Sequence, residues 1–201
     1  MLGLPKSTDM SKQLPKKAIY AKFQLNTAAK DKIDADISRI TIVNEVAPNR
    51  VNIPAGDEVK NFFVLLVSLK RKEFSESTVA TLSKLIPQNI LFILENENES
   101  KLAVYRTKLI QTDWRPTDEH KIELQGLNLD KVWENIVVSI GDIGIQQGYT
   151  LDEQIAVDEK RRKLEKEIEK LERQARAEKQ PKKKFELAQK IKKLNKELEG
   201  C

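Results

Sequence analysis

The chain has 201 residues, 39% hydrophobic and 33% charged, with a formal net charge of +5 at pH 7, which fits one ordinary domain plus an extended element. No apolar run approaches the roughly 18 residues that span a bilayer, and the first residues hold no long apolar segment, so a membrane-spanning or secreted protein is not expected. The only cysteine is Cys201, which excludes an internal disulfide, and we expect a cytoplasmic location.

The first part of the chain predicts a helix followed by a strand. Asn26 or Thr27 can cap a helix over residues 28–37. Residues 38–47 (SRITIVNEVA) alternate apolar and polar side chains, which is typical of a half-buried strand. Residues 51–53 are predicted as a short hairpin partner of that strand.

A parallel pair of strands is predicted at the centre of the domain. Residues 62–69 (FFVLLVSL) are nearly all apolar, as in a strand that is covered on both faces. Residues 75–86 begin with a capping serine, have apolar side chains at helical spacing and end before Pro87. Residues 90–94 (ILFIL) form a second buried run, so the three segments together indicate a βαβ unit.

The next segments predict the remaining sheet and one more helix. Residues 102–110 alternate again, and we expect them to pair with residues 90–94 as a hairpin. Residues 121–124 are predicted as an edge strand. Residues 129–140 (LDKVWENIVVSI) gather their large apolar side chains on one helical face. Residues 1–145 are therefore expected to form an α/β (α+β) domain with a small mixed sheet.

Residues 146–201 predict a second domain, an antiparallel helical hairpin with a coiled-coil seam. Thr150 and Glu153 have the spacing of a capping box. Pro181 disfavours helix in the residue before it but suits the first position of a new helix, so the first helix should stop near Lys179. Each helix carries an apolar seam at spacings of four, three and four: Leu164, Ile168, Leu171 and Ala175, then Leu187, Ile191, Leu194 and Leu198.

Two interpretations of these seams remain open. The seams either cover each other and leave the remaining charges in solvent, or part of a seam docks on another protein or on a second copy of the chain. Isolated helices with seams of about three turns are marginal in water, so pairing of some kind must stabilise them.

Positive charge is confined to the two ends of the chain. Residues 1–23 and 151–201 each carry +4, whereas residues 24–150 carry −3. Lysines gather at the predicted hairpin tip and along the second helix, and the candidate contact residues there are Lys182, Lys183, Lys184, Lys190 and Lys193. Such a tip can contact DNA phosphates without sequence preference. The alternative is a lysine-rich face that only keeps the hairpin soluble.

Trp114 and Arg115 are a second candidate contact. They follow a predicted strand and lie in a loop, where a tryptophan beside an arginine can anchor an interface. The alternative is that Trp114 covers the edge of the core.

The sequence argues against several enzyme classes. His120 is the only histidine, placed on the surface by its polar neighbours, so the ligands of a structural zinc site are lacking. The chain has no nucleophile elbow, no glycine-rich dinucleotide motif and no phosphate-binding loop. We therefore expect no catalytic, cofactor-binding or metal-binding residues and no cofactor. One alternative remains, a metal-dependent nuclease with Glu45, Glu95 and Lys70 or Lys72 on the mixed sheet.

Four segments carry a resemblance to a known family: LPKSTDMSKQLPKKAIYAKF, KLIPQNILFILE, KLAVYRTKLIQTDW and ARAEKQPKKKFELAQKIKKLNKEL. Over nearly its full length the chain resembles a bacterial family described as a domain of unknown function. Members of that family tend to be encoded beside a helicase or restriction subunit and a DNA methyltransferase. The resemblance implies an accessory role in restriction–modification or related antiphage defence, and it supplies no catalytic residues.

The expected function is that of a non-catalytic accessory or adaptor subunit. The expected partner is a helicase or DNA methyltransferase subunit, and DNA is a further candidate partner through the basic hairpin tip. No membrane partner is expected.

Overall fold

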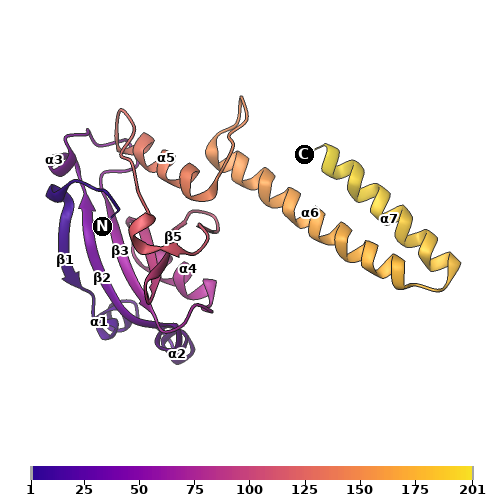
Figure 1. Cartoon of the computed structure of the whole chain (residues 1–201), viewed down its shortest axis with the longest axis horizontal. Coiled ribbons are helices and arrows are strands. Elements are labelled where there is room, and N and C mark those ends of the chain that lie inside the picture. The colour runs from indigo at the N-terminus through magenta and orange to yellow at the C-terminus, as the bar shows by residue number, and fades with distance from the viewer. Residues whose placement is uncertain (1, 201) are drawn as a thin grey trace. The chain divides into compact units, whose positions relative to one another are not determined.

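The computed structural model describes residues 2–200, so Cys201 lies outside the described part (Figure 1). The chain divides into two compact units, Met1–Asp142 and Ile143–Cys201. The first unit is called the body and the second the arm. Across residues 2–200, no helix has the length and apolar character needed to cross a membrane.

The body is built on a seven-stranded mixed sheet. The strands are β1 (Asp9–Gln13), β2 (Ile37–Val46), β3 (Phe62–Leu69), β4 (Asn89–Asn96), β5 (Glu99–Tyr105), β6 (Leu109–Gln111) and β7 (Arg115–Pro116). They lie in the order β1-β2-β3-β4-β5-β6, and β7 pairs with β5 off this path. The pairing of β3 with β4 is parallel, and the other pairings are antiparallel. The predicted α/β class is confirmed.

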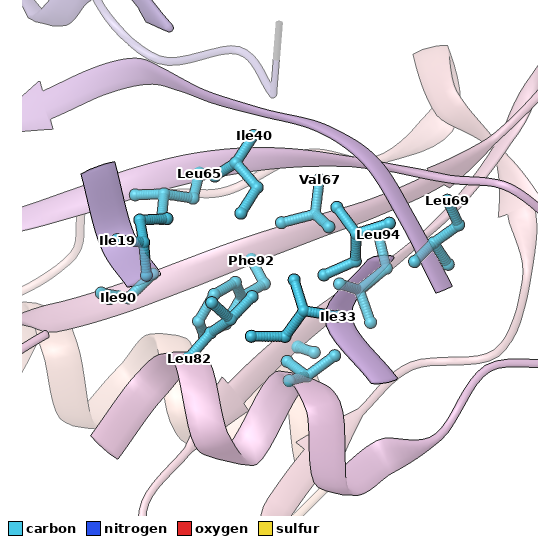
Figure 2. Packing of buried hydrophobic residues seen from close by; sticks show 13 residues of the cluster. Ile19, Ile33, Ile40, Leu65, Val67, Leu69, Leu82, Ile90, Phe92 and Leu94 are labelled. Atoms are coloured by element: carbon cyan, nitrogen blue, oxygen red, sulfur yellow. The ribbon is translucent and has the colours of Figure 1, made fainter. Parts of the chain in front are cut away.

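Helices lie against both faces of this sheet. The body helices are α1 (Lys16–Lys22), α2 (Thr27–Asp36), α3 (Pro48–Val51), α4 (Glu76–Leu85) and α5 (Leu129–Gly141), with 3-10 turns η1 (Lys6–Thr8) and η2 (Thr117–Glu119). One core layer joins α1, α2 and α4 to β2, β3 and β4, and includes Ile19, Ile33, Ile40, Leu65, Leu82 and Phe92 (Figure 2). Since side chains alternate along a strand, Phe62 points to the opposite face. There its ring lies 5.1 Å from that of Trp133 in α5.

The predicted βαβ unit and hairpin are confirmed. α4 connects the parallel strands β3 and β4, and a turn at Glu97 and Asn98 leads from β4 into its antiparallel partner β5. The strand predicted over residues 102–110 is split, because the chain turns after Tyr105 and resumes as β6. Sequence periodicity does not reveal β1 or α1, because each buries too few apolar side chains to produce a pattern.

The strands predicted at residues 51–53 and 121–124 are wrong. Pro48 occupies the first turn of α3, and Asn52 ends that helix in the left-handed conformation (φ 55°), so the chain coils there instead of extending. In residues 121–124, the Ile122 N–H donates a hydrogen bond to the Leu2 carbonyl at 2.9 Å. These four residues form no strand.

The start of α4 is capped by a carboxylate from another helix. Asp36 is 4% exposed and accepts hydrogen bonds from the Ser75 N–H (3.0 Å) and the Thr78 hydroxyl (2.8 Å). The predicted capping role of the Ser75 side chain is wrong, because its hydroxyl contacts the Ser77 hydroxyl instead. The Asn26 side chain does cap α2 as predicted, by accepting from the Ala29 N–H at 2.9 Å.

A second carboxylate holds the loop before β3. Asp130 accepts from the N–H groups of Asp57 (2.6 Å), Glu58 (3.2 Å) and Val59 (2.7 Å). These bonds, with that of Val59 the largest cause, hold the pKa of Asp130 below its usual range. The neighbouring Gly56 leaves room for the carboxyl group, because a Cβ there would lie 2.1 Å from Asp130 Cγ.

Candidate nucleic-acid and partner interface

The arm consists of two antiparallel helices, as predicted. α6 (Leu151–Ala177) begins with a complete capping box between Thr150 and Glu153. α7 (Pro181–Glu199) begins with Pro181 in its first turn. The helices are in contact, and Lys160 of α6 pairs with Glu197 of α7 at 3.3 Å (Figure 1). The first helix ends two residues before the predicted Lys179.

The two seams are covered to different degrees. Leu164 and Ile168 of α6 are each 8% exposed, whereas the α7 seam (Leu187, Ile191, Leu194 and Leu198) is half-buried throughout. The seam residues therefore lie along the contact between α6 and α7, in agreement with the first interpretation of the seams. The second interpretation, in which a partner contacts the half-exposed edge of the α7 seam, remains a prediction.

The lysines of the hairpin tip are solvent-exposed at the start of α7. Lys182, Lys183 and Lys184 are all exposed, and this first turn contains no acidic residue. The N-terminus of a helix carries a positive partial charge and favours anions, so three lysines there oppose the helix dipole. The first turn of α7 is therefore positively charged.

Glu178 is an acidic group in the turn before this tip. Its carboxylate accepts a hydrogen bond from the Gln180 N–H at 2.8 Å. That bond is the largest cause that lowers the pKa of Glu178, with a smaller contribution from the charge of Lys183. The carboxylate is thus already engaged in the turn between the helices.

An open groove lies where α6 ends and α7 begins. It has a volume of about 720 Å³, and its charged lining is mixed: Glu178, Lys179, Lys183, Glu186 and Lys190. Lys190 and Lys193, further along α7, are both exposed. The five candidate lysines predicted from the sequence therefore share one helix.

Trp114 and Arg115 lie in the body. Trp114 is half-buried and packs against the core layer of α1, α2 and α4, with Lys72 and Lys101 Nζ 5.7 and 5.5 Å from the ring centroid. Arg115 is exposed and pairs with Ser100 in the β5–β7 ladder. These contacts agree with a tryptophan that covers the core edge, and the role of the pair as an interface anchor remains a prediction.

The residues of the nuclease alternative do not converge. Glu45 pairs across the sheet with Phe63, and Glu95 pairs with Ser68. The backbones of the two glutamates are thus offset by five positions along β3, or roughly 16 Å at 3.3 Å per residue. Glu45 also forms an ion pair with Arg50 at 3.0 Å.

The two lysines of that alternative are engaged elsewhere. Lys70 Nζ donates to the Asp34 carbonyl, and Lys72 pairs with Glu99. Within residues 2–200 there is no cluster of three or more histidine, cysteine or carboxylate side chains that could hold a metal ion. The structure thus provides no cleft that brings the proposed nuclease residues together.

The prediction that His120 lies on the surface is wrong. Its side chain is 7% exposed, and Nε2 lies 2.9 Å from the Ser100 carbonyl, which can only accept, so Nε2–H donates. His120 follows the turn η2, and this hydrogen bond joins its ring to β5. The role of His120 in the fold is therefore structural.

Sequence reasoning missed Phe185. This side chain is 64% exposed, although it follows directly after the three tip lysines. Two residues before Leu187, it lies about 200° around the helix from the apolar seam, and that spacing could have identified it.

The matching family is described as "Domain of unknown function (DUF4391)", and it covers residues 2–198. The chain belongs to this family. No curated protein and no solved structure matches the chain at a significant level.

Proposed function

We propose that this DUF4391 protein is a non-catalytic accessory subunit of a bacterial restriction–modification-like antiphage defence complex. The body docks on a helicase or DNA methyltransferase subunit, and the arm bridges that subunit to DNA. The bacterial defence setting comes from the family resemblance in the sequence, and the bridging role comes from the arm.

The charge of α7 is the observation that carries the proposal. The helix has seven lysines and three glutamates, whereas α6 has eight basic and eight acidic residues. Three of the lysines stand at the positive end of the helix dipole, where they cost stability. Phosphate groups bound there would gain from both the lysines and the dipole.

Partner capture tests the bridging role. The full-length protein, tagged and expressed in its native host, should co-purify with a helicase or DNA methyltransferase identified by mass spectrometry. Loss of that partner in a variant with substitutions on the body surface, but not in a variant of the hairpin tip, would assign docking to the body. Recovery of the tagged protein without either class of enzyme would contradict the proposal.

A salt titration tests the DNA contact. Replacement of Lys182, Lys183 and Lys184 by Gln should weaken binding to duplex DNA of any sequence. It should also reduce the slope of log affinity against log salt by about 0.9 for each lost phosphate contact. Fluorescence anisotropy with two unrelated duplexes measures both quantities.

A matched variant in α6 controls for net charge. Lys163, Lys166 and Lys170 lie on α6 at spacings of three and four, and their replacement by Gln removes the same number of charges as the tip variant. This variant should keep the wild-type slope, because Lys163 already pairs with Glu159 at 2.6 Å and glutamates alternate along the helix. Equal effects of the two triple variants would show that net charge alone is responsible, and the tip would not be a DNA contact.

A further inference from the structure

α7 has a second regular row of side chains besides its apolar seam. Lys182, Phe185, Gln189, Lys192 and Lys196 follow one another at spacings of three, four, three and four, and all five are exposed. This row is called the outer stripe.

The outer stripe faces away from α6. Phe185, Gln189, Lys192 and Lys196 each precede a seam residue (Leu187, Ile191, Leu194 and Leu198) by two positions. Two positions correspond to about 200° around an α-helix, so the stripe lies on the side opposite the seam. The hairpin therefore uses one face of α7 to pair with α6 and leaves the other face uncovered.

The charges of the stripe are of one sign. Lys182, Lys192 and Lys196 make no ion pair within residues 2–200. No acidic residue occupies a stripe position, and Glu197 is engaged by Lys160 of α6. On α6, by contrast, basic side chains are locally neutralised, as in the Arg173–Glu169 and Arg176–Glu172 pairs.

Phe185 has no structural role that explains its position. It is 64% exposed, and it lies one turn from Lys182 on a helix whose other large apolar residues are half-buried at the seam. An aromatic ring among lysines provides both parts of a single-strand contact: cations for the phosphates and a flat surface on which an unpaired base can stack.

We propose that the outer stripe of α7 binds single-stranded nucleic acid, with its lysines on the phosphates and Phe185 stacked on a base. This proposal rests on the DNA contact of the proposed function. It adds that the outer stripe contacts nucleic acid in the single-stranded form. From Lys182 to Lys196 the stripe spans roughly 21 Å at 1.5 Å per residue. That length corresponds to about six stacked nucleotides at 3.4 Å each.

Two other occupants fit the stripe less well. A second copy of the same stripe would bring lysines against lysines, which is unfavourable. A membrane surface would need an apolar face next to the basic one, and the apolar face of α7 packs on α6 while the stripe offers one large apolar side chain. A single-stranded polyanion requires neither arrangement.

Substitutions of Phe185 in the full-length protein test the stacking. The probes are a fluorescein-labelled oligothymidylate and a duplex of equal length, measured by anisotropy. Phe185→Leu keeps an apolar side chain and removes the ring, so the affinity for the single strand should fall about 5- to 150-fold, the equivalent of roughly 1–3 kcal/mol per stacked base. Phe185→Tyr keeps the ring and should bind like the wild type. Duplex affinity should change little in both variants.

Substitutions of the lysines test the phosphate contacts. In one variant, Gln replaces Lys182, Lys192 and Lys196. Its slope of log affinity for the oligothymidylate against log salt should be smaller by about 0.7 for each lost phosphate contact. The triple variant of Lys163, Lys166 and Lys170 is the matched control and should keep the slope.

The outcomes separate this proposal from the proposed function. Duplex binding that depends on Lys182, Lys183 and Lys184, together with a Phe185→Leu variant that binds the single strand like the wild type, would overturn the stacking proposal alone. Binding to vesicles of phosphatidylserine and phosphatidylcholine in place of the oligonucleotide, or a dimer that depends on Phe185 in sedimentation, would also overturn it. Recovery of the tagged wild-type protein without a helicase or methyltransferase would instead overturn the proposed function, whichever strand form the arm binds.

Discussion

Truncation of one seam residue should destabilise the arm and leave the stability of the body unchanged. Ile168 is 8% exposed, and replacement of a buried isoleucine by alanine costs about 2–5 kcal/mol. A unit of ~60 residues has a stability of roughly 3–9 kcal/mol at 0.05–0.15 kcal/mol per residue. The Ile168→Ala variant should therefore lose a large fraction of the stability of the arm. Leu194→Ala should cost about half as much, because Leu194 is only half-buried.

Urea unfolding of the full-length protein can follow the two units separately. Both tryptophans, Trp114 and Trp133, lie in the body, so tryptophan fluorescence reports the body alone. Circular dichroism at 222 nm also reports the arm, because α6 and α7 contribute 27 and 19 helical residues. In the Ile168→Ala variant, the circular dichroism transition should gain an early phase while the fluorescence midpoint is unchanged.

Glu167→Ala is the control for this substitution. Glu167 is exposed on α6 next to Ile168, and its replacement should change stability by no more than about 0.5 kcal/mol. An Ile168→Ala variant with a wild-type circular dichroism curve would refute the seam as the source of arm stability. A joint shift of both signals would show that body and arm unfold as one cooperative unit.

Two further substitutions test local features of each unit. Because backbone hydrogen bonds lower the folded-state pKa of Asp130, the stability it contributes is present above the unfolded pKa of about 3.9 and is lost as pH falls through the folded pKa. Asp130→Asn should therefore melt at a lower temperature than the wild type at neutral pH, and this difference in fluorescence-detected melting should shrink in acid; a constant difference would contradict the charge-dependent role. Thr150→Ala removes the side-chain half of the capping box and should destabilise the arm by about 0.5–2 kcal/mol in circular dichroism, and an equal shift of tryptophan fluorescence would argue against a local effect.

Long, strongly patterned segments of this fold are predictable from the sequence. The continuous apolar runs of β3 and β4, the seams of the arm and the break at Pro181 all follow from spacing and backbone chemistry. Residues 51–53 form a segment too short for its apolar pattern to distinguish a strand from a helix. In the structure, the αL conformation of Asn52 ends a helical turn there. The capping of α4 by Asp36 joins residues about forty positions apart, and no local pattern encodes such a contact.

The candidate interface is predictable only in part. The lysine run at 182–184 is visible as composition, and its exposure agrees with that interpretation. Phe185 is difficult to place from the sequence, because an aromatic residue near an apolar seam suggests a core position and only its angular offset from Leu187 separates the two faces. The burial of His120 depends on a hydrogen bond to β5, which a polar sequence context does not reveal.

The order of the strands gives the body a direction of assembly. From β1 to β6, each strand lies beside the one that precedes it in the chain. During synthesis, each new strand therefore emerges when its partner already exists, and each pairing closes only the connection between two consecutive strands, which limits the entropic cost. The carboxylate of Asp130 can reach the amides of residues 57–59 only after α5 has been made. The amide hydrogens of this loop before β3 should thus exchange freely with solvent in the nascent chain. They should become protected when α5 emerges and Asp130 accepts their hydrogen bonds.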